Sequence, residues 1–339
     1  MTDPVRKSRV TSFDVAEKAG VNQSTVSRAL KGDPAITEKT RTRIQLVAQQ
    51  LGYRVDDRAA RLRGGKTGTI AVIVITRPGV DFTEINPFHY NLLGSVCAAA
   101  AARGYQALVS FQSEPKSYYS DYIESRQADS LIILGTSTND AAWQFHRPLL
   151  DRTNVASWGS PFGDHRRIAS DNLTGGRLAA ERLLQGGYRE LVFIGDVDDR
   201  QTQFRDRYTG FCDALAKVGR SAGPSIDATG GTRVEQGRNS VEELIASGRA
   251  FDGLFCCCDA MALGALQALT KAGISVPKQV GVIGFDGLTS GAHASPPLTT
   301  IEPDFKLAGT MLVDAALAGD GEGADGRIPV HIVERASVS

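Results

Sequence analysis

The sequence predicts two parts of different fold class: a small all-α head at the N-terminus, and an α/β core of two doubly wound parallel-sheet lobes. The first observation behind this division is charge. Residues 1–66 carry 14 Lys and Arg against 7 Asp and Glu, whereas the rest of the chain carries 24 against 31. The second is pattern, because short helical patterns fill the first segment and strand-length apolar runs alternate with helical patterns afterwards. The basic head indicates a polyanion as partner, although an ordinary solvated surface explains its charge equally well.

Composition excludes several classes of protein. With 339 residues, 42% of them hydrophobic and 22% charged, the chain is typical of a folded protein with a sizeable core. No run approaches the roughly 18 apolar residues of a membrane helix, and the polar start MTDPVRKSRV lacks the apolar core of a signal peptide. The five cysteines are an odd number and three are consecutive (256–258), which predicts neither a disulfide framework nor a metal site. We therefore expect a cytoplasmic protein with no membrane partner.

Three helices are expected in the head. The first begins after Thr11 or Ser12, the second spans Gln23–Leu30, and the third runs from about Thr37 to Leu51. Two short helices joined by a glycine-containing turn are typical of the helix-turn-helix, whose second helix enters the major groove of DNA. That helix presents the short polar groups and the cation that reading bases and binding phosphates require, namely Gln23, Ser24, Thr25, Ser27 and Arg28. The alternative is a small helical bundle with a polar face.

A basic linker follows the head. Residues 57–66 contain three arginines, one lysine, two glycines and a single large apolar residue, Leu62. Gly65-Lys66-Thr67 resembles the end of a phosphate-binding loop, but Ala60 stands where that pattern needs its first glycine, and the segment precedes a strand. We therefore interpret the segment as a linker.

The core alternates strands and helices. The expected strands are Thr69–Ile75, Gln106–Phe111, Ser130–Leu134, Asn154–Ser157, Leu191–Ile194, Gly253–Cys257 and Val280–Phe285. The expected helices are Phe88–Arg103, Gly175–Gln185, Arg205–Lys217, Glu235–Ala246 and Asp259–Ala272. Such alternation predicts parallel sheets with helices on both faces, and the length favours two lobes with a ligand cleft between them.

The pattern of reactive residues does not predict an enzyme. The five histidines are scattered, without the short spacings of a metal site, and no nucleophile-elbow motif occurs. Ser113–Lys116 matches a four-residue catalytic pattern but lies in a loop without its partner motifs, and Gly281–Gly287 lacks the glycine order of a nucleotide-binding loop. We expect no catalysis, no cofactor and no metal.

Several segments carry a resemblance to a known family. VTSFDVAEKAGVNQSTVSRALKGDPAITEKTRTRIQLVAQQLGY resembles the DNA-binding domain of the lac repressor/galactose repressor family of bacterial transcription regulators. NPFHYNLLGSV, SDNLTGGRLAAERLL, RDRYTGF, CDAMALGAL, VGVIGFD and PPLTTIEPDF resemble the core of the same family, in the same order. The resemblance implies a ligand-responsive repressor that binds a pseudo-palindromic operator as a dimer or a dimer of dimers. It also implies a core folded like type I periplasmic sugar-binding proteins, with a sugar or related metabolite as effector.

The expected domains follow from these segments. Residues 1–54 form the helix-turn-helix head and 55–66 the hinge. The N-terminal lobe comprises 67–169 and 303–331, and the C-terminal lobe comprises 170–302 and 332–339.

The resemblance also implies roles for residues of the head and hinge. Gln23 and Ser24 occupy positions where the family varies its base-reading residues, and Arg28 matches a base or phosphate contact; Ser12, Thr25 and Ser27 complete the expected DNA-binding set. Leu62 matches a leucine that wedges into the minor groove, with Arg58 and Arg61 beside phosphates. A linker leucine packed on the core is the alternative for Leu62. The acidic pair Asp56-Asp57 departs from the family pattern and leaves the hinge geometry less certain.

For the effector, the resemblance implies a cleft set consisting of Phe88, His89, Ser157, Trp158, Gln203, Arg207, Cys258, Asp259 and Asp286. Arg207 and Asp286 match the family's recurring ligand contacts, and their alternative is a salt bridge across the cleft. Trp158 is equally compatible with the core, His89 with a solvated helix position, and Asp259 with a helix N-cap. Ser157 and Cys258 replace an aspartate and an asparagine of some relatives, so we expect a different ligand.

Two other functions fit parts of the sequence. A solute-binding protein for transport would suit the core alone, but the basic head and the missing export signal argue against it. A sugar-processing enzyme that regulates its own operon would need a catalytic constellation that the sequence does not contain. The effector's identity, its direction of action, the operator sequence and the regulated genes stay open.

Overall fold

The computed structural model describes residues 10–53, 65–79, 85–135, 139–162, 166–197, 202–222, 225–226, 229–319 and 326–339. The chain divides between Thr67 and Gly68 into two units, which we call the head and the core and describe separately. Within the described ranges, no helix combines the length and apolar character needed to cross a membrane.

The head is a three-helix unit, made of α1 (Ser12–Ala19), α2 (Gln23–Leu30) and α3 (Glu38–Leu51). Thr11 caps α1 in a capping box with Asp14, and Gly20 ends the helix in the left-handed conformation at φ 62°. The three helices bury a small apolar cluster that includes Val15, Val26 and Ile44. This cluster fixes α2 against α1 and α3 and leaves the polar side of α2 outward.

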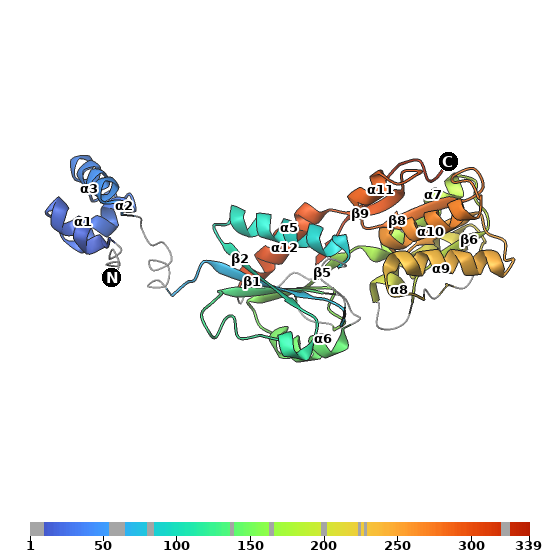
Figure 1. Cartoon of the computed structure of the whole chain (residues 1–339), viewed down its shortest axis with the longest axis horizontal. Coiled ribbons are helices and arrows are strands. Elements are labelled where there is room, and N and C mark those ends of the chain that lie inside the picture. Colours follow the sequence, from blue (N-terminus) through green and yellow to red (C-terminus); the bar gives the residue numbers. More distant parts are fainter. Residues whose placement is uncertain are drawn as a thin grey trace, which may run out of the picture. The chain divides into compact units, whose positions relative to one another are not determined.

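The first lobe of the core, the N-lobe, is a six-stranded sheet in the order β10-β5-β4-β3-β1-β2. Figure 1 labels β1, β2 and β5 of this sheet. Its strands are β1 (Thr69–Ile75), β2 (Gln106–Gln112), β3 (Ser130–Gly135), β4 (Val155–Trp158), β5 (Arg167–Ser170) and β10 (Gly326–Ile328). Its helices are α5 (Pro87–Ala102), α6 (Asp140–His146) and α12 (Phe305–Leu317), with short 3₁₀ turns at Pro115–Ser117 and Arg147–Leu149.

Both faces of the N-lobe sheet are covered. Along β1, Ile70 and Val72 pack with α5 and α12, whereas Ala71 and Ile73 pack on the opposite face in the cluster that contains Trp143 of α6. Successive side chains of a strand point to opposite faces, so a strand buried on both sides reads as one apolar run. All seven residues of β1 are buried accordingly.

The second lobe of the core, the C-lobe, is a five-stranded sheet in the order β11-β9-β8-β7-β6. Its strands are β6 (Leu191–Ile194), β7 (Gly253–Cys256), β8 (Gly281–Phe285), β9 (Thr299–Pro303) and β11 (Val330–Val333). Its helices are α7 (Asn172–Gln185), α8 (Thr202–Lys217), α9 (Arg233–Ala246), α10 (Asp259–Lys271) and the short α11 (Thr289–Ala292).

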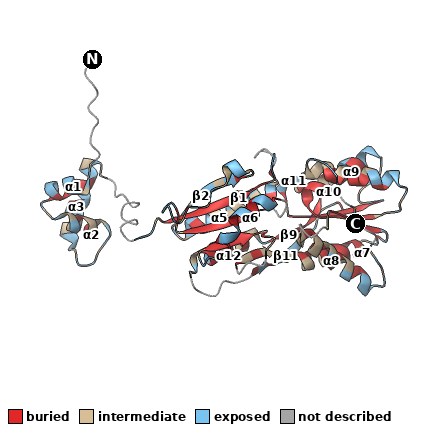
Figure 2. Cartoon of the chain, turned by 90° about the horizontal axis from the view of Figure 1, so that it is seen from below, coloured by how far each residue is buried: buried red, intermediate tan, exposed pale blue. Residues whose placement is uncertain are grey.

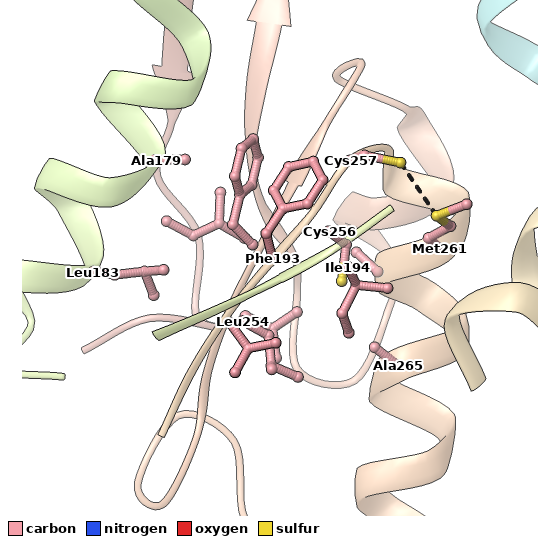
Figure 3. Packing of buried hydrophobic residues seen from close by; sticks show 14 of the residues in the cluster. Ala179, Leu183, Phe193, Ile194, Leu254, Cys256, Cys257, Met261 and Ala265 are labelled. Carbon is pink, nitrogen blue, oxygen red and sulfur yellow. Dashed lines mark hydrogen bonds between the residues drawn. The ribbon is translucent and has the colours of Figure 1, made fainter. Parts of the chain in front are cut away.

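In the C-lobe, α7 packs closely against α8 and α9 against α10, around a large apolar interior. Gly176 of α7 lies against the backbone of Arg207, and Gly264 of α10 lies against the backbone of Val234, so neither position has room for a side chain. Figure 3 shows the interior, where Phe193 lies centrally and the Cys257 Sγ approaches the Met261 Sδ at 3.2 Å. Figure 2 colours the strands around β1 as buried, in agreement with the burial of all seven residues of β1.

The chain passes between the two lobes three times. It leaves the N-lobe after β5, returns between β9 and α12, and leaves again between β10 and β11. The last passage occurs at Pro329, two residues before the expected boundary at 331, because Val330 already pairs with Pro303 in the C-lobe sheet.

Most predicted elements of the core are confirmed. β1 and β6 have the expected bounds, and the other expected strands and helices differ from the structure by a few residues at their ends. The predicted parallel-sheet lobes are confirmed, with one antiparallel strand at the edge of the C-lobe sheet, where β11 pairs with β9. The sequence analysis also missed β5, β9, β10, β11, α6 and α12.

Candidate functional sites

A cavity of about 400 Å³ lies between the two lobes of the core. It lies at the carboxyl ends of the parallel strands, where Thr76 follows β1, Gly135 ends β3, Trp158 ends β4 and Asp286 follows β8. In doubly wound sheets this edge is where ligands bind. The first turns of five helices (α5, α7, α8, α9 and α10) also contribute lining residues.

The structure brings most of the expected effector residues together at this cavity. Seven line it: Phe88, His89, Trp158, Gln203, Arg207, Cys258 and Asp286. Ser157 and Asp259 do not belong to the lining.

Asp286 and Arg207 form a buried pair on the C-lobe wall. The guanidinium Nη1 lies 3.7 Å from the carboxylate Oδ1, and both side chains are about 5% exposed. Burial raises the pKa of Asp286 well above its ordinary value, while the charge of Arg207 opposes this effect. Arg207 stacks on the Phe285 ring at 3.4 Å and donates from Nε to the Asn172 Oδ1 at 2.9 Å. The pair therefore lies within the C-lobe wall and does not cross the cleft as the expected salt bridge would, and both of its residues line the cavity.

Asp286 has an unusual backbone. Its φ is 118°, in the region that L-residues rarely adopt. The amide donates to the Ile301 carbonyl at 2.8 Å, and Gly287 follows with φ 69°. Strain of this kind persists where the surroundings over-determine it, commonly at functional positions. Here it accompanies a carboxylate at the lining of the cavity.

The N-lobe wall is partly aromatic. The Phe88 ring lies 5.8 Å from Trp158 and 5.4 Å from Phe305, and Trp158 is 6% exposed. Trp158 therefore packs in the core and also lines the cavity, so its expected place in the effector site and the alternative of a core residue are compatible. His89 is neutral near pH 7, because burial lowers its pKa to about 4. Its Nδ1 is buried without a hydrogen-bond partner in the described structure.

Cys258 lies where α10 begins. It is the N-cap residue of that helix and is 2% exposed. A hydrogen bond from Cys257 lowers the pKa of the Cys258 thiol to about 6, and the charges of Arg233 and Arg207 act in the same direction.

Ser157 and Asp259 are absent from the cavity lining for different reasons. Ser157 is buried within β4 at 1% exposure, one residue before the carboxyl end of the strand, where Trp158 lines the cavity. Asp259 is fully buried and ties α10 to the C-lobe sheet region, since its carboxylate accepts from the Leu288 amide and the Thr300 hydroxyl, each at 2.6 Å. It is the first residue of α10, not its N-cap.

Sequence reasoning missed several polar residues of the lining. They include Arg77, Asn86, Ser160, Arg167, Asp171, Asp206, Arg233 and Arg327. Arg77 donates to the Gly231 carbonyl at 2.8 Å and so connects the two lobes. Arg167 and Arg327 were missed because β5 and β10, which carry them, were not recognised as strands. Asn86 had a usable signal, since a residue of its kind directly before Pro87 is typical of a helix N-cap.

The head presents the polar face that the sequence predicts. Ser24 and Arg28 of α2 are exposed, whereas Gln23, Thr25 and Ser27 are partly exposed. Gln23 donates to the Ser12 hydroxyl at 3.1 Å, which links the start of α2 to α1. Arg28 is paired with Asp33 at 2.8 Å.

The expected hinge residues Arg58, Arg61 and Leu62 lie outside the described residues. Among the residues that the structure does describe, no group of three or more His, Cys, Asp or Glu is placed to hold a metal ion.

Comparisons with known proteins agree for both units. Residues 13–56 match the model of bacterial regulatory proteins of the lacI family, and residues 180–338 match a periplasmic binding protein-like domain. The HTH-type transcriptional regulator CelR of Thermobifida fusca is 29% identical, over 98% of this chain and 99% of its own. The HTH-type transcriptional repressor CytR of Escherichia coli K12 is 28% identical, over 89% of this chain and 87% of its own. Both of these relatives are named as regulators, not as enzymes.

Solved structures extend this similarity to the fold. A complex of CelR with cellobiose matches with a TM-score of 0.69 and 25% identity, covering 97% of this chain and all of the other. A lac repressor dimer bound to operator and an anti-inducer matches with a TM-score of 0.77 and 23% identity, covering 97% and 99%.

Proposed function

We propose that the chain is a lacI-type transcriptional repressor whose affinity for operator DNA is controlled by a small molecule; the match of residues 13–56 to the lacI family model and the similarity to CelR over 98% of the chain support this. The observation that carries the proposal is one chain with both parts: a head with an outward polar helix, and a core with a cavity between two lobes. We place it in the bacterial cytoplasm, where its operator lies, and assign it no catalytic activity.

The DNA contact is assigned to α2. Ser24 and Arg28 are exposed, and Gln23, Thr25 and Ser27 are accessible in part, so the helix offers donors, acceptors and a cation along one side. Ser12 at the start of α1 supports Gln23. Arg58, Arg61 and Leu62 are proposed as hinge contacts from the family resemblance alone.

The effector is assigned to the cavity, and its class follows the relatives. A volume of about 400 Å³ is within the usual size of small-molecule sites. Phe88 and Trp158 supply an apolar wall, while Asp286 and Arg207 supply an acceptor and a donor fork for hydroxyl groups. CelR was solved with cellobiose, which supports a sugar or related metabolite here. A ligand that binds two lobe arrangements with different affinity shifts their populations and thereby the operator affinity.

A homodimer is proposed as the DNA-binding form, with a tetramer as the alternative. β2 is the last strand of the N-lobe sheet and exposes Leu108, Val109 and Phe111, each 36–38% accessible. Exposed apolar side chains on an edge strand favour association with another chain. The similar lac repressor structure is a dimer on its operator, which supports a pseudo-palindromic site read by two heads.

The test is operator binding by the full-length protein. Genomic fragments selected by the protein are titrated at fixed salt against random competitor DNA, with wild type, Gln23→Ala and the control Gln49→Ala, an exposed glutamine of α3. We expect Q23A to lower specific affinity by about 10-fold and Q49A to change it by less than about 2-fold. Binding should fall steeply with salt. If no fragment is preferred over random DNA, with or without candidate metabolites, the proposed function is wrong.

The effector role has its own variants. Asp286→Asn and Arg207→Gln should keep operator affinity but lose release of the operator by whichever metabolite releases it from wild type. A variant that still responds at wild-type concentrations would remove that residue from the effector site.

A further inference from the structure

Two arginines of the N-lobe lie on neighbouring strands and line the cavity together. β5 and β10 run parallel, with Ala169 opposite Arg327 in the register. Arg167 precedes Ala169 by two residues, so its side chain leaves the same face of the sheet as that of Arg327. All three residues line the cavity. Two guanidiniums therefore extend from one sheet edge toward the same space.

Neither guanidinium is neutralised within the described part of the chain. Arg167 and Arg327 make no ion pair with any described residue, and the nearest acid along β5, Asp171, caps α7 by accepting from the Thr174 amide at 3.1 Å. The C-lobe wall differs, because Arg207 there faces the Asp286 carboxylate at 3.7 Å. The charge of the lining is thus balanced on one wall and positive on the other.

The helices add to this positive potential. The first turns of α5, α7, α8, α9 and α10 all contribute to the lining. Helix N-termini carry partial positive charge and unsatisfied amides, which favour anions. The hydroxyl groups of a neutral sugar can accept hydrogen bonds from the two arginines, but only an anion would also be stabilised by their charge and by the helix termini.

We propose that the effector is a polyhydroxylated metabolite with an acidic group, a carboxylate or a phosphate, which Arg167 and Arg327 bind. Its hydroxyl groups face Asp286 and Arg207 on the opposite wall. This proposal rests on the function proposed above and names the chemical class of its ligand. It also explains why these two arginines line the cavity without an ion-pair partner among the described residues.

The experiment measures binding of matched acids and neutral parents to the full-length protein by calorimetry. The carboxylate arm uses gluconate, glucuronate and galacturonate, the phosphate arm uses glucose 6-phosphate, ribose 5-phosphate and inorganic phosphate, and the neutral arm uses glucose, galactose, ribose and cellobiose. The proteins are wild type, Arg167→Gln, Arg327→Gln, Arg167→Lys and the control Arg152→Gln. Arg152 is a surface arginine of the same lobe, paired with Glu124 and absent from the lining. Circular dichroism establishes that each variant is folded.

We expect at least one acid to bind wild type 10-fold or more tightly than its neutral parent, with the better arm identifying carboxylate or phosphate. R167Q and R327Q should each weaken the binding of that acid by 10-fold or more. R167K should restore part of the lost affinity, and R152Q should change the affinity by less than 2-fold. The proposal is overturned if no acid binds, if neutral parents bind as tightly, or if the glutamine variants bind the acid unchanged. A neutral sugar that releases the operator would overturn this proposal and leave the repressor function standing. Absent operator preference would overturn the repressor function and with it the effector role, but not the measured binding of an acid by Arg167 and Arg327.

Discussion

At the scale of single residues, the buried polar groups of the C-lobe have two separate tasks. Asp286 follows the last residue of β8, has a strained backbone conformation, and lies in the cavity lining with its carboxylate. Asp259, which is also buried, is satisfied inside the protein by the Leu288 amide and the Thr300 hydroxyl. A buried carboxylate that is fully hydrogen-bonded by the protein supports the fold, whereas one at a cavity wall is available to a ligand.

The structural role of Asp259 predicts a graded loss of stability. Asp259→Leu leaves the Leu288 amide and the Thr300 hydroxyl without an acceptor, so the unfolding free energy of the core should fall by about 2–4 kcal/mol. Asp259→Asn keeps one acceptor and gives Thr300 a donor, and should cost about 1 kcal/mol or less. Urea unfolding measures both. Equal losses for the two variants would contradict the proposed hydrogen bonding.

The same residue predicts a pH dependence. Burial raises the pKa of Asp259 from 3.8 to about 7, so the folded state holds a proton that the unfolded state releases between these values. The stability contribution is therefore complete below pH 3.8 and is lost as the pH rises through 7. From pH 5 to 8, the wild type should lose about 2 kcal/mol relative to Asp259→Asn. A pH-independent difference between the two proteins would contradict this pKa.

The candidate site was partly predictable at this scale. Residues in family motifs, such as Arg207 and Asp286, were found because the motif fixes their place at strand and helix ends. Ser157 was included with its neighbour Trp158, but only Trp158, at the carboxyl end of β4, lines the cavity, and the end of β4 was not predicted exactly. Arg167 and Arg327 come together only through the register of β5 and β10, which no local pattern encodes.

At the scale of elements, apolar pattern predicted the long central strands and failed at the lobe crossings. β1 is buried throughout and reads as one apolar run. β5, β10 and β11 have three or four residues of mixed character, and their pairing depends on strands far away in the sequence. α12 is apolar enough to be recognised as helical, but the sequence analysis did not assign it, and Asp304 at its N-cap was the missed signal.

One prediction belongs to α2 as an element. The Arg28 Nε donates to the Asp33 Oδ2 at 2.8 Å, just after the helix ends, and both side chains are accessible to solvent. Asp33→Asn keeps the acceptor for the Ala35 amide, removes a charge that DNA phosphates repel, and releases Arg28 to bind a phosphate.

We expect D33N to bind random-sequence DNA about 3- to 10-fold more tightly at low salt, with a log–log salt slope steeper by about 1. Fluorescence anisotropy over a series of salt concentrations measures both quantities, with Arg28→Gln/Asp33→Asn as the control that should lose the gain. An unchanged salt slope in D33N would place Arg28 away from the phosphates.

At the scale of the whole molecule, the three passages between the lobes tie the C-terminal third of the chain to both sheets. α12 and β10 complete the N-lobe, whereas β9 and β11 belong to the C-lobe. A ligand that contacts both walls therefore acts on segments that are continuous with each sheet, which is a physical basis for coupling the cavity to lobe orientation. The two-lobed architecture was predictable from length and alternation, but this interleaving of the lobes was not.

The stability of the core should also depend on a buried histidine that is not part of the cavity lining. His146 of α6 is fully buried, and its Nε2 lies 2.9 Å from the Gln112 Oε1. Because that oxygen also accepts from the Tyr119 amide at 3.2 Å, Nε2 is the protonated nitrogen, and the buried Nδ1 has no partner in the described structure. Burial lowers the pKa of His146 from 6.5 to about 4. Between pH 6.5 and pH 4, His146 is therefore protonated in the unfolded state and neutral in the folded state. The free energy of unfolding falls as the pH decreases through this range.

His146→Phe removes this titration and keeps a ring of similar size beside Tyr118 and Phe145. Between pH 7 and pH 5, the wild type should lose about 2 kcal/mol more unfolding free energy than the variant does. Urea titrations at both pH values measure the difference, and pH 8, where His146 is neutral in both states, gives the packing cost of the substitution alone. His89 has the same lowered pKa and is unchanged in both proteins, so its contribution cancels. If wild type and variant lose stability in parallel between pH 7 and pH 5, His146 is not the group that makes the core sensitive to acid.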